Sequence, residues 1–177
     1  MDEVGPDRII LAWPAPPAGT EAIPALRVAT RVLQAMAHQA AVPRARVVLD
    51  EERLASVVFA ELPLAKNVAH AGLLRHLDDA IEQMTGALGA IDGAHFAWAR
   101  TTVGAHAYFD FDALDDRGAT LGRAMSVLGD PRAPERQLRE TVAASADDVR
   151  SAVAWFLRPD RRVVAFVHGS APQPGAR

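Results

Sequence analysis

The chain has 177 residues, a length that suits one domain with enough buried apolar surface to form a core. Its formal net charge of −3 gives no electrostatic reason to expect binding to nucleic acid or to an anionic membrane. Because the chain contains no cysteine, disulfides, thiolate zinc sites and a cysteine nucleophile are excluded.

The amino-terminal sequence MDEVGPDRIILAW is acidic and then only briefly apolar. It lacks the basic start and the longer apolar core of a signal peptide. Elsewhere no uncharged apolar run approaches the roughly 20 residues that cross a bilayer. We therefore expect a cytoplasmic protein that does not associate with membranes.

The first third of the chain predicts a strand, a helix and two further strands. The apolar stretch 8–13 predicts a strand, and the prolines after it end the strand because proline cannot donate to a sheet. A helix opens at Thr20 or Glu21, and two short strands follow at 45–49 and 55–62. The helix is expected to bury an apolar stripe made of Leu26, Ala29, Val32, Leu33 and Met36.

The middle of the chain predicts helices. One helix, capped by Asn67, covers 67–85, and a long helical segment covers about 91–128. Within the long segment, Gly104 and Gly118 are expected bends or close-packing points. A shorter helix follows at 134–144. The apolar period of the long segment is carried by Phe96, Val103, Ala107, Phe111, Leu114, Leu121, Met125 and Leu128.

The stretch SADDVRSAVAWFLRPDRRVVAFVH, residues 145–168, carries the most regular signals in the chain. Ser145 and Asp148 predict a capping box, and the apolar spacing after them predicts an amphipathic helix that Pro159 ends. The β-branched run 163–167 is too short for a helix, and we expect it to be a central strand. Residues 169–177 are expected to be a tail.

These elements follow the order β–α–β–β–α–α–α–α–β, with no linker that would divide the chain. We expect one domain over 1–177, with its core at about 8–168. Strands separated from a run of helices indicate a two-layer α+β fold, in which helices pack on one face of a mixed, mostly antiparallel sheet.

Several phrases, in this order, resemble the insulinase (pitrilysin-type, inverzincin) family of zinc metallopeptidases. RIILAWPAPP followed by EAIPALRVATRVL is similar to the opening strand and first helix of a peptidase half domain of that family. The helical segment 91–128, the sequence GDP, a short helix and then SADDVRSAVAWFLRPDRRVVAFV are similar to its closing part. The resemblance covers about residues 8–168 and is weakest between 40 and 90.

The resemblance implies two related halves that enclose a chamber in which an unfolded peptide is cut. The catalytic half carries His-x-x-Glu-His on a helix, where two histidines bind zinc and the glutamate activates water. None of the six histidines of this chain begins that motif. The chain therefore resembles the non-catalytic, C-terminal-type half, and we expect no catalytic residue, metal ligand or cofactor in it.

On this resemblance we expect a pseudoenzyme subunit that works with a separate zinc-bearing chain of the insulinase type, as a heterodimer. It would close the chamber and help to bind the peptide substrate, without being catalytic alone, and the zinc would lie in the partner chain. The alternative is a structural or docking module with the same fold and no role in proteolysis. No motif indicates which residues contact a substrate.

Two pairs of side chains have the residue types of metal ligands. His70 and His76 are six residues apart, which separates them by about 240° around a helix, so they cannot chelate one ion together. His106 and Asp110 are four residues apart and could hold a metal, but the aromatic residues between and beside the acids favour a solvated acidic helix face. Neither pair predicts a metal site.

Other chemistry is weakly indicated. Arg158, Arg161 and Arg162 could bind an anion such as a peptide carboxylate, but compensation of the helix-end dipole in a solvated turn is favoured. There is no Gly-x-Ser-x-Gly sequence and no phosphate-binding glycine loop. The tryptophans lie in apolar patterns and are expected in the core: Trp13, Trp98 and Trp155.

Overall fold

The computed structural model describes residues 7–39, 44–63, 70–85, 93–109 and 114–168. These residues form four strands and six α-helices, with one turn of 3-10 helix before the last strand. In chain order the elements are β1 (Arg8–Ala15), α1 (Ala22–Gln39), β2 (Arg46–Asp50), β3 (Ser56–Pro63), α2 (His70–Thr85), α3 (Gly93–Phe109), α4 (Leu114–Leu128), α5 (Ala133–Ala143), α6 (Ala146–Phe156), the 3-10 turn η1 (Pro159–Arg161) and β4 (Val163–Val167).

The strands form one sheet in the order β2-β3-β1-β4, and all three pairings are antiparallel. The predicted two-layer α+β fold is confirmed, and no parallel pair occurs among the described strands. The prediction of a central strand at 163–167 is wrong, because β4 pairs with β1 alone among the described strands and lies at the edge of their sheet. Val163 and Phe166 are accordingly 68% and 48% exposed.

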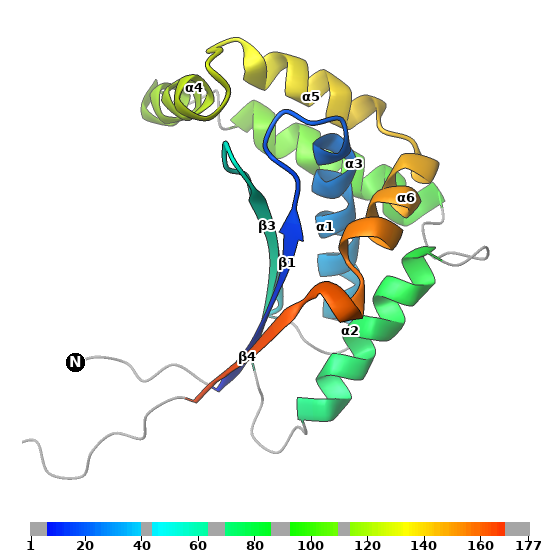
Figure 1. Ribbon diagram of the computed structural model, residues 1–177. Helices are drawn as coiled ribbons and strands as arrows, with labels where there is room; N and C mark the ends of the chain where they lie inside the picture. Colours follow the sequence, from blue (N-terminus) through cyan, green and yellow to red (C-terminus); the bar gives the residue numbers. More distant parts are fainter. Residues whose placement is uncertain (1–6, 40–43, 64–69, 86–92, 110–113, 169–177) are drawn as a thin grey trace, which may run out of the picture.

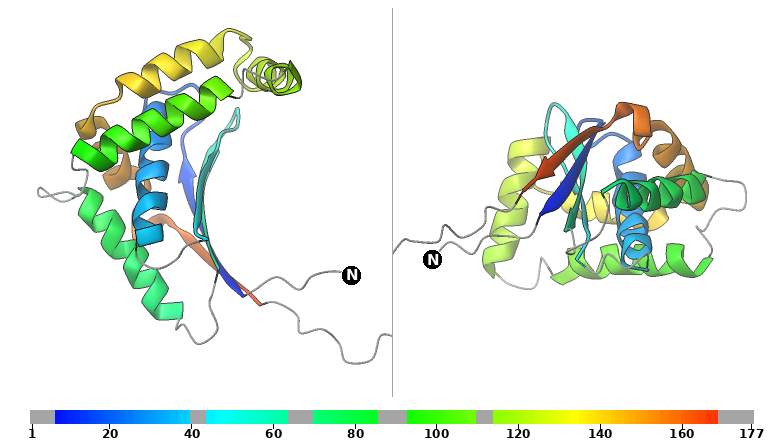
Figure 2. Two further views of the ribbon diagram at one scale, coloured as in Figure 1. Left: turned by 180° about the vertical axis from the view of Figure 1, so that it is seen from behind. Right: turned by 90° about the horizontal axis from the view of Figure 1, so that it is seen from below.

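Helix α1 packs directly on the sheet, and α2, α3, α5 and α6 pack against α1. Helices α1, α2, α3, α5 and α6 lie on one face, and α4 lies beyond the turn between β2 and β3 (Figures 1 and 2). The opposite face of the sheet has no described helix over it. No helix among the described residues is long and apolar enough to cross a membrane.

The core lies between the inner face of the sheet and α1. Alternate residues of the strands point inward, because side chains along a strand alternate between its two faces. Helix α1 buries its predicted apolar stripe against this inner face of the sheet. Trp13 is fully buried, and its indole N–H donates to the carbonyl of Arg158 at 3.2 Å, which ties the first strand to the last turn. The largest fully buried side chains are Trp13, Ile9, Leu11, Ile23, Leu26, Leu33, Leu62 and Leu157.

The helical segment predicted at 91–128 is two helices rather than one. α3 ends at Phe109 and α4 begins at Leu114, and the two helices point in different directions in Figure 1. Gly104 and Gly118, the expected bends, lie within these helices. The predicted stripe is also not buried throughout, because Leu114 and Met125 of α4 are 80% and 56% exposed. α4 therefore packs at the periphery of the molecule and is not part of the hydrophobic core.

The predicted capping box at Ser145 is confirmed. The Ser145 hydroxyl accepts from the backbone N–H of Asp148 at 3.1 Å, and the Ser145 N–H donates to the Asp148 carboxylate at 2.8 Å. Hydrogen bonds from the Ser145 side chain and backbone hold the pKa of Asp148 below its usual value. The helix ends at Phe156, and Pro159 opens the 3-10 turn.

Only one of the three tryptophans lies in the core as predicted. Trp98 is 49% exposed and Trp155 is 63% exposed, so the prediction is wrong for both. Trp98 lies on α3, which packs against α1 and α5, and Trp155 lies on α6, which packs mainly against α1 and α2. The guanidinium of Arg161 lies 5.8 Å from the centroid of the Trp155 ring, a cation–π contact.

Candidate functional site

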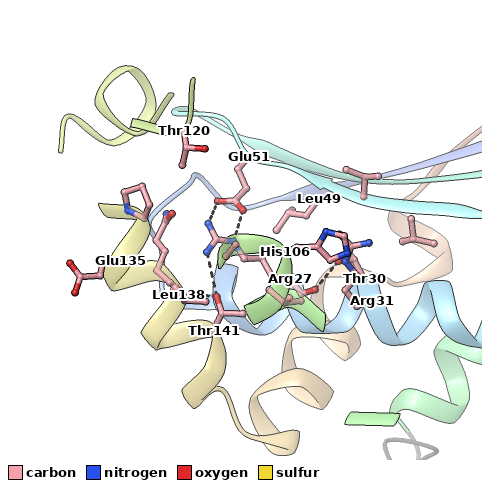
Figure 3. A pocket seen from close by; sticks show the side chains of 16 residues that line it. Arg27, Thr30, Arg31, Leu49, Glu51, His106, Thr120, Glu135, Leu138 and Thr141 are labelled. Carbon is pink, nitrogen blue, oxygen red and sulfur yellow. Dashed lines mark hydrogen bonds and ion pairs between the residues drawn. The ribbon is translucent and has the colours of Figure 1, made fainter. Parts of the chain in front are cut away.

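A cleft of about 710 Å³ opens where α1, α3 and α5 meet the β2 edge of the sheet (Figure 3). Its lining includes residues from both faces of β2: Val47 and Leu49 point inward, whereas Val48 points outward. A cavity can touch both faces of a strand only if it follows the strand's edge. We call this cavity the β2-edge cleft; its lining residues are Arg27, Thr30, Arg31, Val47, Val48, Leu49, Glu51, Val103, His106, Ala107, Thr120, Pro134, Glu135, Gln137, Leu138 and Thr141.

An ion pair closes one end of the cleft. The Arg27 guanidinium donates two hydrogen bonds to the Glu51 carboxylate, at 2.6 and 2.8 Å, and a third to the Thr141 hydroxyl at 3.3 Å (Figure 3). The two charged side chains are only 20% and 17% exposed. This pair joins α1 to the β2–β3 turn, and the Thr141 contact adds α5.

Two further basic side chains line the cleft without a partner among the described residues. Arg31 of α1 is partly buried, and His106 of α3 is exposed at the rim. Figure 3 shows their side chains pointing to the same part of the cleft. The cleft therefore combines an apolar lining with unpaired positive or ionisable nitrogen groups.

The residues of the cleft do not suit zinc. Arg27, Thr30 and Arg31 stand on α1 at the spacing i, i+3 and i+4, which is the spacing of His-x-x-Glu-His. Guanidinium groups stay protonated and offer a metal no lone pair, so this set cannot replace two histidines and a glutamate. Among the described residues no group of three or more histidines and carboxylates is placed to hold a metal ion.

The candidate ligands from the sequence are mostly not brought together. His106 lines the cleft, but Asp110 lies outside the described residues, as do the side chains of His70 and His76. Arg162 instead binds Asp78 of α2. Arg158 donates to Asp160, and these hydrogen bonds lower the pKa of the Asp160 carboxyl.

Sequence reasoning missed the cleft itself. The available signal was a pair of arginines four residues apart on α1, Arg27 and Arg31, preceding an acidic turn at 50–52. That pattern is common on solvated helices, so it could not show that the turn folds back onto the helix. Only the β-strand pairing places Glu51 beside Arg27.

The outward face of the sheet is a second candidate surface. A row of apolar side chains crosses all four strands there, because the pairings align Val48 with Phe59, Phe59 with Ala12, and Ala12 with Val163. Val163 is 68% exposed, and Val57, two residues from Phe59 on the same face of β3, is 39% exposed. We call Val48, Phe59, Ala12 and Val163 the apolar row.

No protein-family model and no curated protein matches the sequence. Solved structures do match the fold. A protein described as a zinc protease, from Bordetella pertussis, gives a TM-score of 0.79 at 17% identity, with 93% of this chain and 95% of that chain covered. The inactive peptidase domain of a similarly described protein from Bordetella parapertussis gives 0.80 at 16% identity, covering 97% and 95%. A chain of complex III from Candida albicans gives 0.76 at 9% identity, covering 94% of this chain and 44% of that one.

Over most of its length the chain is therefore a structural match to domains of M16 (insulinase-type) zinc proteases, including an inactive one. Its helices and four-stranded antiparallel sheet have the fold of one half domain of that type. The resemblance read from the sequence is confirmed at the level of the fold. Half domains of this kind also occur in multi-chain assemblies such as complex III.

Proposed function

We propose that this chain is the non-catalytic half of a two-part M16-type zinc peptidase. It covers the chamber of a separate chain that carries the zinc, and its sheet helps to bind extended peptide. The observation that carries the proposal is the apolar row, which crosses a sheet whose outward face has no described helix over it. Such a face favours an apolar partner surface.

Three further observations support the proposal. The chain has no His-x-x-Glu-His sequence. The cleft residues of α1 that have the same spacing are Arg27, Thr30 and Arg31. Its fold is also that of a protein described as an inactive peptidase domain. β2 and β4 are the edge strands of the sheet that the described residues form, which suits a peptide-binding role, because an added strand binds through its backbone and tolerates many sequences. The cytoplasmic location stays a prediction of the sequence.

Size-exclusion chromatography with a zinc-bearing half-domain chain from the same organism tests the proposal. We expect a one-to-one complex that Val163→Lys weakens by about tenfold or more, because the lysine places a charge in the apolar row. Leu114→Lys is the control, since Leu114 is 80% exposed on α4, away from the sheet. Equal loss in both variants, or no complex with any such chain, would refute the proposal.

A docking module without a role in proteolysis is the second candidate. The likeness to a chain of complex III favours it, because that chain belongs to an assembly. The two candidates differ in one result. A complex that forms but leaves peptide hydrolysis by the zinc-bearing chain unchanged would select the docking module.

A further inference from the structure

We propose that the β2-edge cleft binds a small amphiphilic anion, a linear monocarboxylate with about eight to ten carbons. The carboxylate would lie at Arg31 and His106, and the alkyl chain would lie along the apolar lining that β2, α3 and α5 supply. The inference goes beyond the proposed function, because this ligand binds to the chain alone and needs neither a zinc-bearing partner nor a peptide.

Both carboxylates that line the cleft already have a guanidinium partner. Glu51 accepts two hydrogen bonds from Arg27, at 2.6 and 2.8 Å. Glu135 accepts a hydrogen bond from Arg139 at 2.7 Å. The negative charges of the lining are therefore balanced, and the remaining basic side chains give the cleft an excess of positive charge. Such a cleft favours an anionic ligand.

Arg31 and His106 are the remaining basic side chains, and neither pairs with another described residue (Figure 3). Arg31 follows Arg27 by four residues on α1, so the two side chains share one face of the helix. Because Arg31 is partly buried, its guanidinium has lost some of its hydration without gaining a partner. A carboxylate can accept two parallel hydrogen bonds from a guanidinium and another from an imidazole N–H. A carboxylate ligand would therefore satisfy both groups.

Apolar side chains from three elements make up much of the remaining lining. Val47 and Leu49 come from β2, Val103 and Ala107 from α3, and Leu138 from α5. All but Val47 are partly exposed, so apolar surface of the protein is still in contact with water there. An alkyl chain in the cleft would remove that surface, and its own, from water. The volume of about 710 Å³ lies within the range of roughly 300–1,000 Å³ that is typical of small-ligand sites.

The length of the lining sets the length of the ligand. The part of α5 that lines the cleft begins at Pro134 and ends at Thr141, so it extends for about 10 Å along the helix axis. An extended chain advances roughly 3.5 Å for every three single bonds. About nine bonds cover this distance, which corresponds to a carboxylate of about eight to ten carbons.

An alkyl chain beside β2 would break no hydrogen bond at the start of that strand. The Val47 N–H already donates to the side-chain oxygen of Gln34 at 3.4 Å. The Ala45 carbonyl contacts the ring Nε2 of His38 at 2.9 Å. Both side chains come from α1, and an alkyl chain can pack against Val47 without competing for either backbone group.

Isothermal titration calorimetry on the purified full chain tests the inference with octanoate, butanoate and octanol. We expect one octanoate to bind per chain. Butanoate should bind at least about tenfold more weakly, because it lacks four methylene groups that the cleft would bury. Octanol should also bind about tenfold more weakly, because it lacks the carboxylate. Failure of octanoate to bind, or equal affinity for octanoate and either of the other ligands, would overturn the proposal.

Two matched pairs of variants locate the ligand. Arg31→Gln should weaken octanoate binding by about tenfold, whereas Arg150→Gln should leave it unchanged, because Arg150 pairs with Asp147 on α6. Ala107→Phe should abolish binding by filling the cleft, whereas Ala105→Phe, at an exposed position of the same helix, should not. Circular dichroism checks that the variants are folded, and if a cleft variant is not, the three ligands compared on the wild-type chain still decide. Octanoate binding that either folded cleft variant leaves intact would overturn the placement of the ligand.

Two further measurements separate the cleft from the apolar row and the ligand from a peptide end. Val163→Lys changes the apolar row, and we expect its octanoate affinity to equal that of the wild-type chain. Because the same variant should weaken the partner complex, the two proposals fail independently. N-acetyl-leucine, which models the carboxyl end of a peptide, should bind at least about tenfold more weakly than octanoate, because its shorter side chain buries fewer methylene groups. Loss of octanoate binding in Val163→Lys, or N-acetyl-leucine that binds as tightly as octanoate, would overturn the proposal.

Discussion

The Arg27–Glu51 pair provides the sharpest test of how the β2-edge cleft is built. Arg27→Met keeps the length of the side chain but leaves the Glu51 carboxylate, 17% exposed, without its cation. Removing one partner of a fully buried pair costs roughly 3–5 kcal/mol. Because about a fifth of each side chain remains in contact with water, we expect roughly 2–3 kcal/mol of lost stability.

The assay is urea unfolding followed by circular dichroism on Arg27→Met, Glu51→Gln and the double variant. The double-mutant cycle should give a coupling energy of about 1–3 kcal/mol, because each single change removes the same pair. Arg150→Met is the matched control, since its ion pair with Asp147 is exposed and should contribute less than about 1 kcal/mol. Single variants as stable as the control, with no coupling, would show that the pair does not hold α1 to the β2–β3 turn.

Three further changes should alter stability measured by the same urea unfolding. Ser145→Ala removes the helix cap and should cost about 1 kcal/mol, whereas Ser151→Ala on the exposed side of α6 should change stability by less than about 0.5 kcal/mol. Equal effects would contradict the role of the cap. Trp13→Phe should cost roughly 2 kcal/mol, because it leaves the Arg158 carbonyl without its buried donor; an unchanged midpoint would contradict that hydrogen bond. Gly129→Ala should lower the stability by about 1 kcal/mol, because Gly129 has a φ of +70°, which a residue with a side chain rarely adopts even where the space is open. Gly72→Ala, inside α2, should instead raise the stability by about 0.5 kcal/mol. The same sign for both glycine variants would contradict this account.

Lowering the pH should weaken the helix cap of α6 and so reduce the stability of the protein. Hydrogen bonds from Ser145 lower the pKa of Asp148, so the folded state favours the carboxylate. The stabilisation is complete above the ordinary pKa of an aspartate and is lost as pH falls through the lowered folded-state value. In Ser145→Ala the pKa of Asp148, followed by NMR titration, should rise toward its usual value. An unchanged pKa in the variant would contradict the capping geometry.

Local signals predicted the elements of this fold well. Ser145 and Asp148 form the expected capping box because a cap depends on neighbours three residues apart. The apolar stripe of α1 is buried as expected because helical period alone determines which side chains share a face. These features need no knowledge of the rest of the chain.

The errors concern features that depend on distant parts of the chain. The run 163–167 has the composition of a buried strand, but the order of strands in the sheet leaves it at an edge. Trp155 follows the helical pattern of α6, yet it is 63% exposed, because no helix or sheet among the described residues packs over its side of α6. The β2-edge cleft was missed for the same reason, since Arg31, Leu49 and His106 meet only through the tertiary fold.

The most direct measurement of the central proposal is peptide hydrolysis by a zinc-bearing half-domain chain that carries His-x-x-Glu-His, titrated with this chain. A quenched fluorescent, unstructured peptide serves as substrate. The account predicts that this chain has no activity alone, and that the rate rises as it is added and saturates at one-to-one stoichiometry. A rate that stays constant throughout the titration, or hydrolysis by this chain without a partner, would contradict it.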